Sequence, residues 1–189
     1  FQSIILGVVE GISEFFPISS TGHLILTSEL LHISQTVFSK SFEVIIQLGA
    51  VSAVVFLYWK TLWHVETIKK LIVAFIPTGI IGLLLYGFVK TYLLGNSMVV
   101  VWALLIGGVV LILFEYFHRE SENAVYTIES ISYRQAIGIG LFQSLAIIPG
   151  VSRSAASIIG GLFLGLTRIT IGEFSFLLAV PTIFAASAL

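Results

Sequence analysis

Pro17-Ile-Ser-Ser-Thr-Gly-His23 interrupts an apolar run with three hydroxyl side chains and a histidine. Pro149-Gly-Val-Ser-Arg-Ser154 interrupts a second apolar run with two serines and an arginine. At membrane depth, a broken segment of backbone is tolerated only where protein or a water-filled cavity surrounds it. We therefore expect a fold built around these two polar breaks, and we expect them to carry the function.

The composition is that of an all-α integral membrane protein. The chain is 57% hydrophobic and 10% charged, with a mean hydropathy of +1.07, whereas about 25% of residues are charged in an ordinary soluble domain. A net charge of -1 and the lack of a long basic block give no reason to expect nucleic acid as a partner. Without cysteine, disulfides, thiolate catalysis and zinc–thiolate sites are excluded.

Membrane-spanning helices are expected in three places. A transmembrane helix needs about 20 mostly apolar residues, and the segments 42–59, 71–89 and 98–117 satisfy this requirement. A fourth span over 173–189 is expected to be incomplete. The chain is thus predicted to be a single membrane domain over 1–189 that is truncated at its C-terminus.

Two segments are too short or too interrupted to cross the bilayer, namely 1–31 and 135–166. Each is predicted to form a helix, a polar loop and a second helix. The part of the first segment after the break, residues 22–31, would be about 15 Å long as a helix, half the thickness of a bilayer. We therefore expect re-entrant hairpins, with pairs of spans that have polar ends as the alternative.

The two hairpins are predicted to belong to an internal repeat. Superposing Pro17 on Pro149 also superposes Ser20 on Ser152, so that repeat 1 covers about 1–59 and repeat 2 about 135–189. Three crossings separate the two copies, which must therefore have inverted topology. Inverted repeats bring broken segments from opposite faces to one site near the midplane.

Basic residues predict the orientation of the chain. Cytoplasmic loops of membrane proteins are enriched in lysine and arginine. Lys40 and Lys90 lie on one predicted side, and six basic residues lie on the other: Lys60, Lys69, Lys70, Arg119, Arg134 and Arg168. The second side should be cytoplasmic, with the first hairpin entering from outside and the second from inside.

Glu10 and Glu14 are four residues apart, so a helix places both carboxylates on one face, about 6 Å from each other. Two buried acids are costly in lipid, and such a pair is expected to share a proton or to hold a cation. The alternative is a helix end at the interface with both acids in water.

The hydroxyls of the first break, Ser19, Ser20 and Thr21, precede a predicted helix. One such hydroxyl can simply cap the helix, but the free N–H groups and positive dipole of a helix N-terminus also bind phosphate. Three hydroxyls beside His23 exceed what capping requires, which favours a phosphate site.

Arg153 in the second break needs an anion at this depth. Its permanent charge and forked donors suit bidentate binding of phosphate, and a salt bridge to Glu10 or Glu14 is the structural alternative. Arg153 could form the salt bridge when the site is empty and bind phosphate when the site is occupied. Three nearby serines could add donors or caps: Ser152, Ser154 and Ser157. Gln47 and Gln143, inside apolar runs, are expected to join helices by hydrogen bonds.

Three motifs resemble the signature motifs of the bacterial undecaprenyl-diphosphate phosphatase family, whose members are linked to bacitracin resistance: Glu10-Gly-Ile-Ser-Glu14, Pro17-Ile-Ser-Ser-Thr-Gly-His23 and Pro149-Gly-Val-Ser-Arg-Ser-Ala-Ala-Ser157. The resemblance implies hydrolysis of undecaprenyl diphosphate to undecaprenyl phosphate and inorganic phosphate, which recycles the lipid carrier of cell-wall synthesis. It implies a multi-pass protein of the bacterial inner (plasma) membrane with an inverted-repeat fold. Members of the family run longer at the C-terminus, which agrees with the expected truncation.

Carried over by motif position, the resemblance implies functional roles for Glu10, Glu14, Ser20, Thr21, His23 and Arg153. It also implies Mg²⁺ or Ca²⁺ as the activating ion, which Glu10 and Glu14 would hold. From their places in the two loops, we add further candidates for substrate binding: Ser19, Ser152 and Ser154.

The mechanism that these residues suggest has Ser20 attacking the terminal phosphorus while Glu14 or His23 accepts its proton. Attack by a water molecule activated at Glu14 is equally compatible with them. A transporter or flippase of a polyprenyl-phosphate lipid is the alternative function, because inverted repeats with broken helices are also typical of alternating access. A homodimer is possible.

Overall fold

The computed structural model describes residues 1–34, 36–93 and 96–188, where regular structure is helical apart from one isolated bridge between Val125 and Leu166. The all-α prediction is confirmed for this part of the chain. The helices are α1 (Gln2–Ser13), α2 (Ser20–Leu30), α3 (Val37–Leu57), α4 (Trp59–Leu62), α5 (Val65–Phe88), α6 (Ser97–Phe117), α7 (Tyr133–Gln143), α8 (Arg153–Phe163) and α9 (Arg168–Ser187). A π turn (Val89–Leu93) extends α5, and 3₁₀ turns cover Ile128–Ser130 and Ser144–Ile147.

Three helices are long and apolar enough to cross a membrane: Val65–Leu93, Ser97–Phe117 and Arg168–Ser187. The first two contain the predicted segments 71–89 and 98–117. Helix α3 covers most of the predicted segment 42–59 but ends at Leu57. These helices give the chain the character of a membrane protein.

Helix α9 is longer than the span predicted over 173–189, because it begins earlier, at Arg168. The Thr167 side chain caps this end and accepts a hydrogen bond from the Thr170 N–H at 3.3 Å. The Arg168 guanidinium stays outside the apolar run by pairing with Glu115 at 2.8 Å and Glu120 at 2.9 Å. A charged first residue can therefore begin a membrane-spanning helix when surface acids neutralise it.

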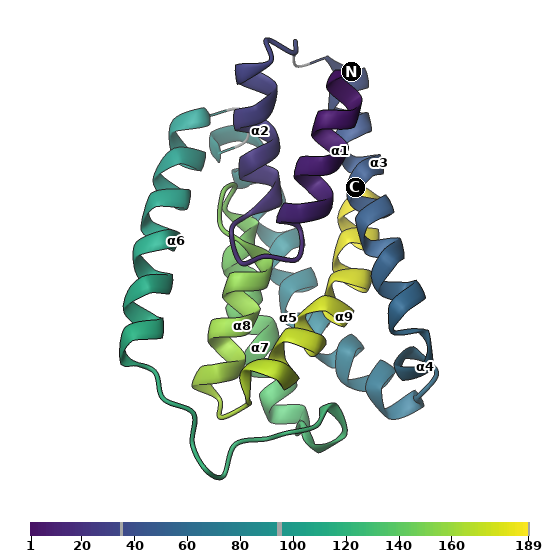
Figure 1. Cartoon of the computed structure of the whole chain (residues 1–189), viewed down its shortest axis with the longest axis vertical. Coiled ribbons are helices and arrows are strands. Elements are labelled where there is room, and N and C mark those ends of the chain that lie inside the picture. Colours follow the sequence, from purple (N-terminus) through teal and green to yellow (C-terminus); the bar gives the residue numbers. More distant parts are fainter. Residues whose placement is uncertain (35, 94–95, 189) are drawn as a thin grey trace.

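Four short helices form two pairs that approach the middle of the molecule from opposite ends. In Figure 1, α1 and α2 lie side by side in the upper half, with their connecting loop pointing downward, whereas α7 and α8 occupy the lower half. In the same view, α6 lies on the left and α3 on the right, and α5 and α9 run obliquely between them. This arrangement brings the two polar breaks of the sequence together.

Side-chain caps fix where the short helices begin. Ser19 caps α2 by accepting from the Gly22 N–H at 3.3 Å, and Ser152 caps α8 by accepting from the Ala155 N–H at 3.2 Å. A serine oxygen at this position satisfies one of the free N–H groups of the first turn. Each polar break thus contains a serine, Ser19 or Ser152, that caps the helix following it.

The apolar core lies where α5, α7 and α9 pack together, and it includes the fully buried Phe174 and Ile139. Gly140 on α7 lets the backbone of α5 approach closely, because a Cβ at this position would overlap the carbonyl oxygen of Ala74. The Gly140 carbonyl also accepts a hydrogen bond from the Thr78 hydroxyl at 2.9 Å. The second hairpin is therefore locked to α5 by backbone contact.

We expect Gly140→Ala to lower the free energy of unfolding by about 1–3 kcal/mol, the usual cost of overpacking a tight contact. Gly107→Ala on α6 is the matched control, since nothing lies within 4 Å of the Cβ it would add. That change should be neutral or slightly stabilising, because alanine favours helix over glycine. Thermal unfolding in detergent measures both variants, and equal stabilities would contradict the packing described.

Candidate active site between the two loops

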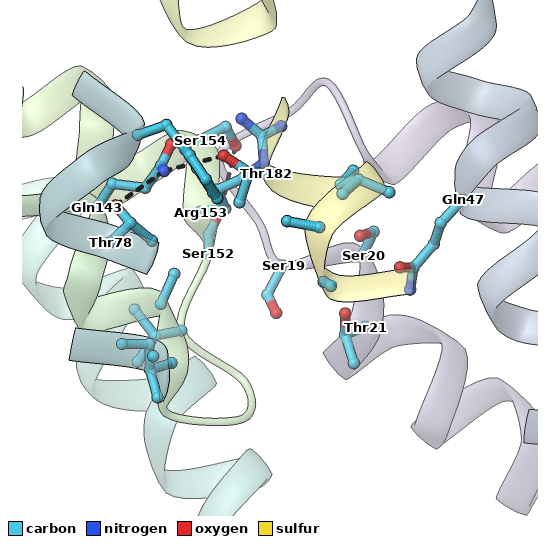
Figure 2. Close-up of a pocket in the computed structure, with 18 of the residues that line it drawn as sticks. Ser19, Ser20, Thr21, Gln47, Thr78, Gln143, Ser152, Arg153, Ser154 and Thr182 are labelled. Carbon is cyan, nitrogen blue, oxygen red and sulfur yellow. Dashed lines mark hydrogen bonds between the residues drawn. The ribbon is translucent and has the colours of Figure 1, made fainter. Parts of the chain in front are cut away.

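The two polar loops face a single cavity of about 510 Å³ near the middle of the molecule. Figure 2 shows its walls, which come from both loops and from α3, α5 and α9. The polar lining residues are Glu14, Ser19, Ser20, Thr21, Gln47, Thr78, Gln143, Ser152, Arg153, Ser154 and Thr182. The rest of the wall is apolar, with residues such as Leu83, Ile147 and Ile183. Such a lining suits a ligand with one polar and one apolar part.

Arg153 and Glu14 form a buried ion pair that joins the two loops. The Nη2 atom lies 3.0 Å from Glu14 Oε1, and the two side chains are 12% and 6% exposed. The Arg153 Nη1 atom donates to the Ser175 carbonyl on α9 at 2.9 Å. The salt bridge considered from the sequence is thus formed, with Glu14 as the partner.

Ser20 donates a hydrogen bond to the other oxygen of Glu14, Oε2, at 2.5 Å. The Glu14 carboxylate therefore contacts the Arg153 guanidinium through one oxygen and the Ser20 hydroxyl through the other. A carboxylate in this position can accept the hydroxyl proton, which makes the serine oxygen a better nucleophile. Ser20 is 7% exposed, so its hydroxyl faces the cavity rather than bulk solvent.

Ser152 and Ser154 line the cavity but also hold the loops in place. The Ser154 hydroxyl donates to the carbonyl of Phe16 in the first loop at 2.9 Å. It also lies 3.0 Å from the Ser152 hydroxyl, whose oxygen caps α8. The two loops are therefore joined by a neutral hydrogen bond in addition to the ion pair.

Glu10 lies one helical turn before Glu14, but it is not among the residues that line the cavity. Its side chain is 1% exposed, and neither carboxylate oxygen has a hydrogen-bond partner in the part of the chain described. Since Glu14 is also buried, the alternative of two acids in interfacial water is wrong. A carboxylate buried without a partner is costly, which points to a missing cation or proton.

Among the described residues, no group of three or more His, Cys, Asp or Glu side chains could hold a metal ion. Mg²⁺ is nevertheless often bound by one or two carboxylates together with the phosphate oxygens of a substrate. The oxygens of Glu10, which have no hydrogen-bond partner among the described residues, fit such a shared site together with the carboxylate of Glu14. A site formed by protein side chains alone does not fit these residues.

His23 is half-buried on α2 and is also absent from the cavity lining described. Its Nδ1 atom lies 2.9 Å from the carbonyl oxygen of Ser19. The His23 ring therefore contacts the backbone of the residue directly before Ser20. Thr21, by contrast, is exposed and faces the cavity with Ser19 and Ser20 (Figure 2).

Gln143 joins three helices, as the sequence predicted. It is fully buried on α7, and its Nε2 donates to Thr78 on α5 and to Thr182 on α9, both at 3.1 Å (Figure 2). Gln47 instead lines the cavity from α3. The two threonines escaped the sequence analysis because hydroxyls are ordinary inside apolar helices. Each directly follows a proline within its helix, Pro77 or Pro181, and that pattern could have marked them.

Comparison with known proteins identifies relatives over nearly the whole chain. A family model described as "Bacitracin resistance protein BacA" matches residues 3–189. A protein from Persephonella marina is 56% identical over 188 residues, which cover 99% of this chain and 73% of the relative. Proteins from Aquifex aeolicus and Sulfurihydrogenibium sp. are 54% identical over 188 residues and 53% over 186, covering 99% and 98% of this chain and 73% of each relative. All three are named undecaprenyl-diphosphatase.

Proposed function

The chain belongs to the bacitracin resistance protein BacA family, and we propose that it catalyses the reaction for which its relatives are named. It hydrolyses undecaprenyl diphosphate to undecaprenyl phosphate and inorganic phosphate. The observation that carries this proposal is the meeting of Arg153, Glu14 and Ser20 at one cavity wall. The names of the relatives do not favour the alternative of a lipid transporter.

The membrane placement of the site follows from helix lengths. Helices α1, α2, α7 and α8 have 11 or 12 residues each, or roughly 17 Å, whereas a bilayer core is about 30 Å thick. Helices of this length support two re-entrant hairpins whose loops meet near the midplane. The approach of the two helix pairs from opposite ends of the molecule supports an inverted repeat (Figure 1). The bacterial inner membrane and a homodimer remain predictions from the sequence.

Substrate binding exchanges one anion for another at Arg153. The guanidinium leaves Glu14 and pairs with oxygens of the terminal phosphate, since its forked donors match phosphate as well as carboxylate. The hydroxyls of Ser19 and Thr21 and the first N–H groups of α2 supply further donors. The apolar part of the cavity wall receives the start of the prenyl chain.

In the chemical step, Glu14 Oε2 accepts the proton of the Ser20 hydroxyl, and Ser20 Oγ bonds to the terminal phosphorus. The bond from that phosphorus to the bridging oxygen breaks, and undecaprenyl phosphate leaves with the electron pair. The departing undecaprenyl phosphate takes the proton from Glu14, whose restored carboxylate then deprotonates a water molecule. The water oxygen bonds to the phosphorus as its bond to Ser20 Oγ breaks, and Ser20 Oγ takes a proton back from Glu14, which releases inorganic phosphate. Direct attack by water activated at Glu14 is the alternative route. In either route, Arg153 neutralises negative charge on the phosphate oxygens.

A divalent cation would be held by Glu10 and Glu14 together with oxygens of the diphosphate. When bound, it would neutralise charge that develops on the phosphate oxygens. Glu10 would thereby gain the partner that its buried carboxylate lacks.

We expect Ser20→Ala and Arg153→Ala each to lower the rate of phosphate release from undecaprenyl diphosphate at least about 100-fold, the usual effect of removing a key transition-state contact. Ser52→Ala is a matched control, because the Ser52 hydroxyl is on α3 and donates only to Leu48 of the same helix. Its release rate should equal that of the unsubstituted protein.

Near-normal release by Arg153→Ala would contradict the role of Arg153 in binding phosphate. Rapid quenching followed by mass spectrometry distinguishes the two chemical routes. A phosphate ester on Ser20 supports attack by the serine, whereas full activity of Ser20→Ala would leave only direct attack by water.

Glu10→Gln tests the cation. We expect this change to weaken activation by Mg²⁺ or Ca²⁺, so that half-maximal activity needs about tenfold more metal, because the neutral amide is a poorer ligand than a carboxylate. Titration of phosphate release with each metal after treatment with chelator measures the shift. Glu29→Gln, an exposed acid bonded to Ser97, is the control. An unchanged metal dependence in Glu10→Gln would remove Glu10 from the ion site.

A further inference from the structure

Ser19 has a backbone conformation that side-chain-bearing residues rarely adopt. Its φ is 63° and its ψ is 92°, and among the described residues only one other non-glycine residue, His32, has a positive φ. A conformation of this kind is strained and persists only when neighbouring contacts hold it. The strain lies directly before Ser20, the proposed nucleophile.

The contacts that hold Ser19 come mainly from His23. The Ser19 carbonyl oxygen accepts from the backbone N–H of His23 at 3.1 Å and lies 2.9 Å from its Nδ1 atom. A carbonyl oxygen can only accept, so Nδ1 must carry the proton and donate it. This donation is the same in neutral and in charged histidine.

The start of α2 is fixed on its other side as well. Gly22 packs against Leu104 of α6, where an added Cβ would come within 3.1 Å of the leucine side chain. The first turn of α2 therefore cannot shift freely. If the Ser19 peptide relaxed, the change would have to be taken up at Ser20, which is the next residue.

From these contacts we infer that His23 is a positioning residue for Ser20. Its Nδ1–H holds the Ser19 carbonyl, and the constrained Ser19 backbone keeps the Ser20 hydroxyl on Glu14. Because the ring of His23 contacts the Ser19 carbonyl, and because His23 is not among the residues described as lining the cavity, we assign it a role through the backbone rather than on the phosphate. This inference rests on the proposed function for the part that Ser20 takes in it.

The experiment compares three variants by phosphate release in detergent. His23→Ala removes the donor and should lower kcat on the order of 100-fold, with KM little changed, because the reacting oxygen is misplaced while Arg153 is retained. His23→Asn should recover most of this loss, since its side-chain N–H can replace Nδ1–H. The third variant, Ser19→Gly with His23→Ala, is compared with Ser19→Gly alone, because Ser19→Gly also removes a hydroxyl proposed to bind phosphate. In that background the loss of His23 should lower kcat only about tenfold, because glycine adopts a positive φ without strain.

His32 supplies a matched control for the glycine substitution. It has a φ of 52°, is exposed and lies beyond the end of α2. His32→Gly relieves strain of the same kind away from the cavity. It should not change the activity of the unsubstituted protein, and His23→Ala should still lower kcat on the order of 100-fold when it is added to His32→Gly. The unfolding temperatures of all variants show whether any of them fails to fold.

Two results would overturn the positioning role. One is an His23→Asn variant that folds but is as slow as His23→Ala, as expected of a histidine that transfers protons. The other is an effect of His23→Ala that is as large in the Ser19→Gly background as in the His32→Gly background. Absence of phosphate release by the unsubstituted protein would instead contradict the proposed function, and the role of His23 would fall with it.

Discussion

The buried ion pair of Arg153 and Glu14 constrains this fold. Arg153 carries a permanent positive charge inside an apolar molecule, and it must therefore have an anion beside it. Glu14 supplies that anion from the opposite hairpin, at 3.0 Å. The two loops, 139 residues apart in the chain, are held together by this pair and by the bond from Ser154 to Phe16. The cavity exists because these loops replace helix where the hairpins meet.

The ion pair also explains how a site in lipid can bind a highly charged headgroup. Glu14 pairs with the guanidinium, so Arg153 is not buried without an anion beside it. In the proposed mechanism, a diphosphate takes over Arg153 and leaves Glu14 free to accept the proton of Ser20. Binding and activation of the nucleophile are thereby linked through one carboxylate, and the strained Ser19 backbone keeps the serine within its reach.

Sequence reasoning located the two loops that line the cavity, because polar residues after a proline are conspicuous in an apolar chain. It also anticipated the two possible partners of Arg153, but choosing Glu14 required the packing of two distant helices. The burial of Glu10 was expected, with interfacial water as the alternative, and only the structure decides between the two. The contact of His23 with Ser19 could not be predicted, because spacing within a helix does not show what lies against it. The early start of α9 at Arg168 was missed because acids distant in sequence neutralise that charge.

The ion pair is tested most directly by a double-mutant cycle on the free energy of unfolding in detergent. Glu14→Gln and Arg153→Met should each destabilise the protein by about 3–5 kcal/mol, because each leaves a buried charge without its partner. The double variant should lose far less than both effects together, since neither charge remains. Effects that add to within about 0.5 kcal/mol would show that the two side chains do not interact, and would contradict the account.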